Sequence, residues 1–146
     1  MFDTMNKIKL YLDDVRTPVD SSWTVVRNYT EFVEKVQQVG FDEIDCISLD
    51  HDLGDSAMDE YYTNVSPNYT LNYDNIQEKT GYDCAKWLVS YYINTKHLYD
   101  EWSFPAIYVH SANPIGAANI MGYINNFLMN SHKPQTCVRV KINHVI

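Results

Sequence analysis

Short hydrophobic runs alternate along the chain with segments whose apolar residues recur at helical spacing. Runs at residues 8–13, 23–26, 46–49 and 106–109 predict strands. Residues 137–142 alternate apolar and polar side chains, which is typical of an edge strand. Because the predicted strands alternate with helices, the chain is expected to form an α/β fold with a mainly parallel central sheet.

Each predicted helix begins at a polar residue that can accept a hydrogen bond from a free backbone amide. Thr30 is expected to cap the first helix. Thr80 and Asp83 have the spacing of a capping box and are expected to open the second helix. Asn113 precedes Pro114, so we expect Asn113 to cap the third helix and Pro114 to occupy its first position.

The connection between the first two strands is too short and irregular for a full crossover helix. Pro18 disfavours helical geometry at Thr17, and the polar residues after it have no helical period. We therefore expect a three-layer, flavodoxin-like fold with strand order 2-1-3-4-5, in which the first crossover helix is reduced or missing.

The 146 residues are expected to form a single domain, 1–146, with one interruption. Residues 55–79 are rich in Tyr and Asn and keep neither a helical nor a strand period, so an irregular insertion is expected. It could be a lid, a partner surface or structure packed on the domain. In a lid, its tyrosines could stack on a nucleobase: Tyr61, Tyr62, Tyr69 and Tyr73.

The formal net charge of −8 argues against double-stranded DNA or a membrane as partner, because both are bound through clustered Lys and Arg. A substrate with a phosphate would need a metal ion or a local basic pocket. The cysteines, Cys46, Cys84 and Cys137, lack metal-ligand spacing and are expected to be reduced thiols. Residues 1–9 have no apolar signal segment, so a cytoplasmic location is expected.

Polar residues that can do chemistry follow three of the predicted strands: Asp13 and Asp14, then Asp50, His51 and Asp52, then His110 and Ser111. In a parallel sheet the carboxyl ends of strands meet at one edge, so these residues are expected to lie close together. Crowded carboxylates favour a cation, and oxygen ligands suit Mg²⁺ or Mn²⁺. We expect Asp13, Asp14, Asp50 and Asp52 to supply metal ligands. Alternatively, some of them cap loops or pair with Arg16.

The histidine side chain is the type that ordinarily titrates near neutrality, so one of His51 and His110 could activate water while the other protonates a leaving oxygen. The alternative is that each is a structural histidine. Ser111 could hydrogen-bond a phosphate oxygen, and the helix start after Asn113 offers backbone amides to an anion. His97, His132 and His144 lie outside these clusters and are assigned structural roles.

Four motifs resemble a known family: residues 12–18 (LDDVRTP), 49–54 (LDHDLG), 80–83 (TGYD, with Trp87 and Leu88) and 110–114 (HSANP, with Gly116 and Asn119). Their order resembles the response-regulator receiver fold and, more specifically, the receiver-derived family named for cyclic-phosphate processing. In receivers the acidic pair holds Mg²⁺, the third-strand Asp accepts phosphate and the fourth-strand hydroxyl contacts it. The resemblance covers most of the chain outside the insertion.

This resemblance implies a metal-dependent phosphoesterase that acts on cyclic phosphates, either 2′,3′-cyclic RNA ends or cyclic nucleotides. Asp50, His51, His110 and Ser111 would then be catalytic; the substrate-binding residues would be Arg16, Asn113 and Asn119. The alternative is a non-enzymatic receiver-like signalling or binding module that is phosphorylated on Asp50. The two histidines, and the lack of a Lys-Pro pair after the last strand, favour a hydrolytic pocket. Lys141 lies near the place of the receiver lysine.

Overall fold

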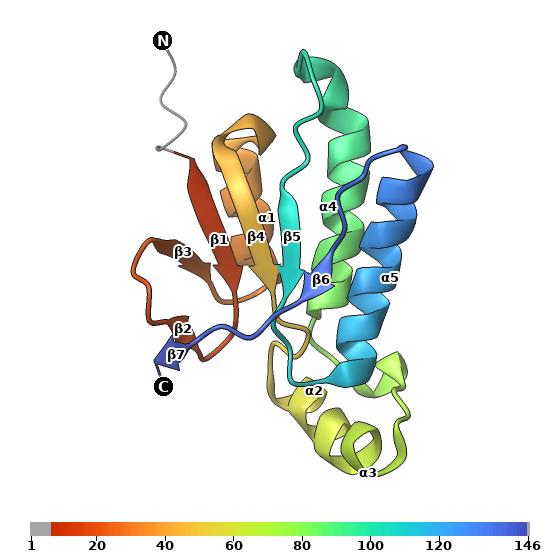
Figure 1. Cartoon of the computed structure of the whole chain (residues 1–146). Coiled ribbons are helices and arrows are strands. Elements are labelled where there is room, and N and C mark those ends of the chain that lie inside the picture. The colour runs from red at the N-terminus through yellow and green to blue at the C-terminus, as the bar shows by residue number, and fades with distance from the viewer. Residues whose placement is uncertain (1–6, 146) are drawn as a thin grey trace.

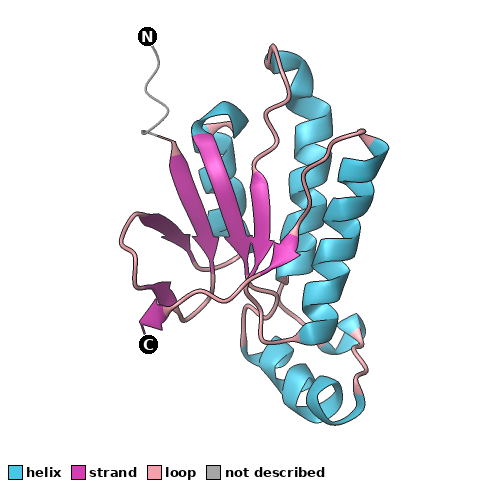
Figure 2. Cartoon of the chain, viewed as in Figure 1, coloured by secondary structure: helices cyan, strands magenta, loops and turns pink. Residues whose placement is uncertain are grey.

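The structure, a computed structural model, describes residues 7–145. Its centre is a five-stranded parallel sheet (Figure 1, Figure 2). The strands are β1 (Ile8–Leu12), β3 (Trp23–Val26), β4 (Ile44–Leu49), β5 (Ala106–Val109) and β6 (Val138–Arg139). Their order is β3-β1-β4-β5-β6, which is the predicted 2-1-3-4-5 order. The receiver-like α/β fold is therefore confirmed.

Three long helices cover one face of the sheet: α1 (Tyr29–Val39), α4 (Gly81–Thr95) and α5 (Pro114–Asn130). α1 contacts α4, and α4 contacts α5; α1 lies behind β1 and β4 in Figure 1. Each helix joins strands that step in the same direction across the sheet, and right-handed crossovers then place all of them on one side. The first crossover helix is missing, as predicted. Within residues 7–145 no long helix covers the other face, so the expected third layer is not formed there.

The hydrophobic core lies between the sheet and these helices. Alternate residues of the central strands point toward the helices and are completely buried, among them Leu10 and Leu12 of β1 and Ile47 and Leu49 of β4. The helices contribute Phe32, Val36, Leu88, Ile120 and Ile124 to the same cluster. This packing fixes the strands, and therefore the positions of the polar residues that follow them.

The helix starts agree with the sequence except at α1. Asn28, rather than Thr30, caps α1 by accepting a backbone amide hydrogen bond from the first turn. Both residue types are good caps, and propensity does not decide between positions two residues apart. The capping box of Thr80 and Asp83 and the Asn113 cap are confirmed. Short 3₁₀ turns follow at η2 (Phe41–Glu43) and η5 (Lys96–Leu98). No helix within residues 7–145 has the length and apolar character needed to cross a membrane.

The insertion is more ordered than the sequence indicates. It contains α2 (Asp55–Glu60), a π-helical turn η3 (Tyr61–Val65), α3 (Ser66–Asn68) and a 3₁₀ turn η4 (Tyr73–Asn75). α2, η3 and α3 follow one another without a break, and the π-helical turn between the two α-helical parts interrupts the 3.6-residue period. The buried Glu60 carboxylate ties them together by accepting hydrogen bonds from the Asn72 amide and from the side chains of Asn64 and Asn75, at 2.9, 2.9 and 2.8 Å.

The C-terminal segment does not continue as the edge strand expected over residues 137–142. The Val140 amide donates to the Val109 carbonyl at 2.8 Å, and the chain then leaves the sheet. It crosses the carboxyl ends of the strands and ends in β7 (His144–Val145), which pairs antiparallel with β2 (Thr17–Pro18) (Figure 1). Pairing with β2 thus draws the segment away from the sheet edge and over the site.

Candidate functional site

Three neighbouring strands end at the same level, and each is followed by a polar residue. The Asp50 amide donates to the Leu12 carbonyl and the His110 amide to the Leu49 carbonyl, each at 3.0 Å. Asp13 follows Leu12 directly. The structure thus brings Asp13, Asp50 and His110 together at the edge of the sheet where α/β folds bind ligands.

Asp13 is completely buried, and both of its carboxylate oxygens are hydrogen-bonded. Oδ1 accepts the amides of Val15 and Arg16 at 3.0 and 2.8 Å. Oδ2 lies 3.1 Å from Arg16 Nε and 3.2 Å from His110 Nε2. Burial alone would raise the pKa of Asp13, but the hydrogen bonds from His110 and the two amides, with the Arg16 charge, lower it. The Asp13 carboxylate is therefore ionised at neutral pH.

Asp14 and Asp50 lie beside Asp13 and have raised pKa values. Burial, and then the charge of Asp13, raise the pKa of Asp50 to about 7, and the same two causes raise the pKa of Asp14. One carboxylate oxygen from each of the three residues lies within 4.8 Å of the other two. Three hard oxygen donors with excess negative charge are the setting that Mg²⁺ and Mn²⁺ prefer. The residues present fit such an ion.

Arg16 is the cation that the chain itself supplies to this cluster. Its Nη2 lies 3.4 Å from Asp50 Oδ2, in addition to the contact of Nε with Asp13. Arg27 holds the loop that carries Arg16, because its Nη1 donates to the carbonyls of Asp13 and Arg16 at 3.1 and 2.7 Å. The loop capping and Arg16 pairing that the sequence left open therefore both occur, beside a donor set that fits a metal ion.

His110 is held between the strands by contacts on both ring nitrogens. Nδ1 lies 2.7 Å from Ser48 Oγ, and Nε2 faces Asp13. The ring stacks on Tyr11 with centroids 4.2 Å apart and an interplanar angle of 6°. Burial lowers the pKa of His110, although Asp13 opposes this. The uncharged imidazole is therefore the main form at neutral pH.

His51 lies in a different, completely buried network. Its Nδ1 is 2.6 Å from Asp52 Oδ1, and its Nε2 is 2.9 Å from Tyr73 Oη, which also accepts a hydrogen bond from Asn119 Nδ2 at 3.0 Å. Every hydrogen has an acceptor if His51 Nδ1–H donates to Asp52 and Tyr73 donates to Nε2. The structure thus joins His51, Asp52 and Asn119 through a tyrosine of the insertion, and places His51 outside the carboxylate cluster.

Two glycines allow backbone and ring to approach this network closely. A Cβ on Gly81 would lie 1.8 Å from the Asp50 carbonyl oxygen, and a Cβ on Gly116 would lie 2.3 Å from the His51 ring. The Gly81 amide donates to the His51 carbonyl at 2.9 Å. The N-terminal ends of α4 and α5 therefore pack directly against the turn that follows β4 and fix the positions of Asp50 and His51.

The segment between β5 and α5 presents Ser111 to the crevice. Ser111 Oγ accepts the Asn113 amide at 3.1 Å, which leaves its hydroxyl hydrogen for donation. The Ser111 carbonyl accepts two hydrogen bonds from the Arg139 guanidinium, at 3.2 and 2.8 Å. Asn113 caps α5 and donates to Asp52 Oδ1 at 3.2 Å. Asn113 thus links the helix start to the His51 network.

A cavity of about 470 Å³ opens beside the carboxylate cluster. Asp14, Asp50 and Asp52 line it, and Tyr61 and Tyr62 of η3 also contribute to its wall. The two tyrosine rings pack edge to face with centroids 5.2 Å apart. The cavity therefore combines carboxylates with aromatic surface from the insertion, and its volume is in the range of small-molecule sites.

A second cavity, of about 630 Å³, lies under the C-terminal segment and is basic. Its wall includes Arg16, Arg139 and Lys141, together with His110 and His144, and no carboxylate among the described residues lines it. Arg16 and Ser111 line both cavities. Lys141 lines this basic cavity but not the one that contains Asp50. In a chain of net charge −8, this is the local basic pocket that a phosphate group would require.

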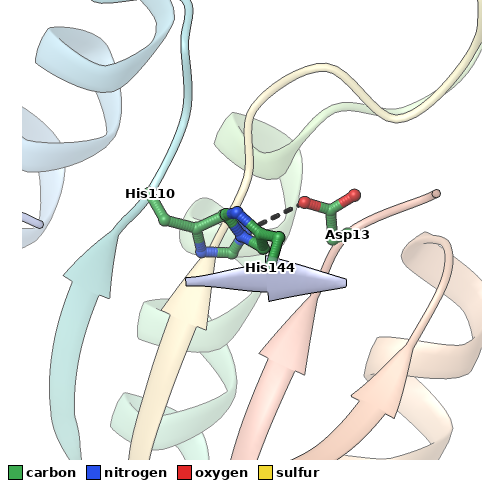
Figure 3. A group of neighbouring side chains, drawn as sticks. All are labelled: Asp13, His110 and His144. Atoms are coloured by element: carbon green, nitrogen blue, oxygen red, sulfur yellow. Dashed lines mark hydrogen bonds and ion pairs between the residues drawn. The ribbon is translucent and has the colours of Figure 1, made fainter. Parts of the chain in front are cut away.

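His144 was assigned a structural role outside any cluster, and the structure contradicts that placement. One ligand atom from each of Asp13, His110 and His144 lies within 4.8 Å of the others (Figure 3). The sequence around His144 gives no signal of this, because the residue reaches the site only when the C-terminal segment crosses the strand ends. Burial, and then the charge of Arg16, lower its pKa. Arg139, which no motif marked, reaches the site by the same path.

Comparison with known protein families identifies a match over most of the chain. The sequence model of the cyclic-phosphate processing receiver domain matches residues 8–126. The matched span contains the carboxylate cluster and both networks around His51 and His110, and it ends before the C-terminal segment. No curated protein and no solved structure matches the chain significantly.

Proposed function

Because the chain belongs to the family of cyclic-phosphate processing receiver domains, we propose that it is a metal-dependent phosphoesterase that opens cyclic phosphates. The substrate is a 2′,3′-cyclic RNA end or a cyclic nucleotide. The observation that carries the proposal is the meeting of a carboxylate-lined cavity and a basic cavity at Arg16 and Ser111.

The boundary between the cavities suits a phosphodiester that carries a single negative charge. Arg16 and the Ser111 hydroxyl offer donors to its free oxygens, and Arg139 and Lys141 make the potential on one side positive. On the other side, Asp13, Asp14 and Asp50 would hold the cation. When bound, such an ion polarises phosphoryl oxygens and lowers the pKa of water.

The two histidines take different parts in this proposal. His110 lines the basic cavity and contacts Asp13, so we assign it to the reaction centre. His51 is completely buried and lines neither of these cavities. His51 is therefore a positioning residue, which links the turn after β4 to Tyr73 of the insertion.

Tyr61 and Tyr62 suit the nucleoside part of the substrate. They line the same cavity as the carboxylates, so a base attached to a bound cyclic phosphate could stack on them. Base stacking tolerates different bases, because every base has a π face. We therefore propose that the insertion contributes affinity for nucleotides without strict base selection.

The test is incubation of the protein with Mg²⁺ or Mn²⁺ and nucleoside 2′,3′- or 3′,5′-cyclic phosphates, with products separated by ion-exchange chromatography. We expect a nucleoside monophosphate from at least one substrate. Asp14→Asn is expected to lower the rate at least about a hundredfold, since it removes a cation ligand, whereas Asp59→Asn, an exposed position in α2, should not.

A parallel incubation with acetyl phosphate and Mg²⁺ tests the signalling alternative. Intact-mass measurement would detect a phosphoryl group on Asp50. A stable adduct without turnover of any cyclic phosphate would overturn the enzyme proposal and support a receiver-like switch. Turnover without a stable adduct would support the enzyme.

A further inference from the structure

We propose that Asp13, His110 and His144 form a second metal site, for a divalent transition-metal ion such as Zn²⁺ or Fe²⁺. The three side chains come from the end of β1, the end of β5 and the C-terminal β7, and they converge on one point (Figure 3). One ligand atom from each lies within 4.8 Å of the other two.

The ligand set differs in kind from the carboxylate cluster beside it. Two imidazoles and one carboxylate suit borderline transition metals, and this combination, with open coordination positions, is a recurrent catalytic arrangement. Asp13, Asp14 and Asp50 offer oxygen only and suit Mg²⁺. The two proposed sites share Asp13 and lie next to each other. The site with two histidines suits a transition metal, and the site with three carboxylates suits Mg²⁺.

His110 has neighbours of the kind that orient a metal-binding histidine. In the metal-free protein His110 Nε2–H donates to Asp13, and the Ser48 hydroxyl, 2.7 Å from Nδ1, can donate to that nitrogen. When an ion takes the place of the Nε2 hydrogen, Nδ1 would carry the hydrogen and donate it to Ser48 Oγ, which would hold the ring as a metal ligand. The Tyr11 ring fixes the plane of the imidazole by stacking on it. A metal-binding role would explain why His110 is buried next to the Asp13 carboxylate.

His144 is oriented in a similar way. Its Nε2 is hydrogen-bonded to the Tyr11 hydroxyl, and its backbone is held by pairing with Pro18 of β2. Tyr11, completely buried, therefore contacts both imidazoles at once. Tyr11 thus orients two histidines beside the same carboxylate, which is the role of a residue that supports metal ligands.

The site is open on the side where a substrate would arrive. His110 and His144 line the basic cavity of about 630 Å³, together with Arg139 and Lys141. Arg16 is the competing cation at Asp13 Oδ2, but its side chain is 32% exposed and can turn toward a phosphate when an ion binds. An ion held by three protein ligands would thus keep positions free for an anionic group in the cavity.

The family match ends at residue 126, so one of the three proposed ligands, His144, lies outside the matched residues. The site also extends the role of His110, which becomes a metal ligand at the reaction centre. The proposal is independent of whether cyclic phosphates are substrates, since it concerns binding of the metal alone.

Titration of the metal-free protein with Co²⁺, followed by visible absorption, tests the proposal, with Mg²⁺ binding followed separately by thermal shift. We expect His144→Gln to weaken Co²⁺ binding at least about tenfold and to leave the Mg²⁺ response in place. Asp14→Asn should do the reverse. His97→Gln, the same substitution at an exposed position in η5, should change neither.

If His144→Gln keeps its Mg²⁺ response, this variant is folded. If it binds Co²⁺ as tightly as the wild type, the second site does not exist. If Asp14→Asn loses Co²⁺ and Mg²⁺ together, a single ion occupies the carboxylate cluster and the proposal is overturned. If Zn²⁺ displaces Co²⁺ from the wild type and Mg²⁺ does not, the borderline metal preference is supported.

Discussion

Replacing Asp50 by Asn should stabilise the metal-free protein, and by more at high pH than at low pH. Burial and the neighbouring charge of Asp13 raise the pKa of Asp50 from 3.8 to about 7. Below about pH 4 the carboxyl is protonated in both the folded and the unfolded state, so it has no effect there. As the pH rises from about 4 to 7, only the unfolded state ionises freely, and stability is lost; above 7 the loss is constant.

The size of the effect follows from the shift. Each pKa unit corresponds to about 1.4 kcal/mol, so the charged carboxylate destabilises the folded state by up to about 4 kcal/mol at pH 8 and by about 1–2 kcal/mol at pH 5. Loss of the 3.4 Å contact with Arg16 reduces the gain at both pH values. The stabilisation by Asp50→Asn should therefore be about 2 kcal/mol greater at pH 8 than at pH 5, or roughly 6 °C in Tm.

Thermal unfolding with a chelator present, at pH 5 and pH 8, measures this difference. Asp45→Asn is the matched control, because Asp45 lies at the other end of the same strand and is exposed. Its effect should be small and independent of pH. If Asp50→Asn instead destabilises the protein equally at both pH values, the carboxylate is ionised and stabilised by Arg16, and the reasoning is wrong.

Other predictions concern the supports of the site. Gly81→Ala should cost about 3 kcal/mol or more, measured by urea unfolding, because the new Cβ would lie 1.8 Å from a backbone oxygen. Gly122→Ala, in α5 with nothing within 4 Å, should instead add about 0.5–1 kcal/mol; destabilisation there would contradict the packing. Tyr73→Phe should cost about 1–3 kcal/mol, because it removes the hydroxyl between His51 and Asn119; an unchanged unfolding midpoint would show that this network contributes nothing. Tyr62→Ala should weaken nucleotide binding about tenfold in equilibrium titration, and unchanged affinity would exclude stacking on this ring.

The sequence predicted the parts of the site that local patterns specify. Asp13, Asp50 and His110 follow strands whose apolar runs are clear, and the parallel order then places them together. The caps at Thr80 and Asn113 were predictable for the same reason, since their signals lie within four residues.

The rest depends on contacts between distant segments. The position of His144 depends on the pairing of two-residue strands, β2 and β7, that no hydrophobic period announces. The order of the insertion depends on Glu60, a single buried carboxylate that satisfies amides 12 to 15 residues away in its contacts with Asn72 and Asn75. The room for the His51 ring depends on Gly116, in a helix more than 60 residues later. Such contacts are set by tertiary packing and leave no local signature.

The most direct test of the proposed activity is a ³¹P NMR time course on an oligonucleotide that ends in a 2′,3′-cyclic phosphate. With Mg²⁺ or Mn²⁺, the wild type should convert the cyclic-phosphate resonance into that of a phosphomonoester, and a chelator or Asp14→Asn should stop the conversion. The same experiment with a 3′,5′-cyclic nucleotide shows which cyclic phosphate is preferred. If both resonances persist with the wild type under every metal, the account of this crevice as a phosphoesterase site is contradicted.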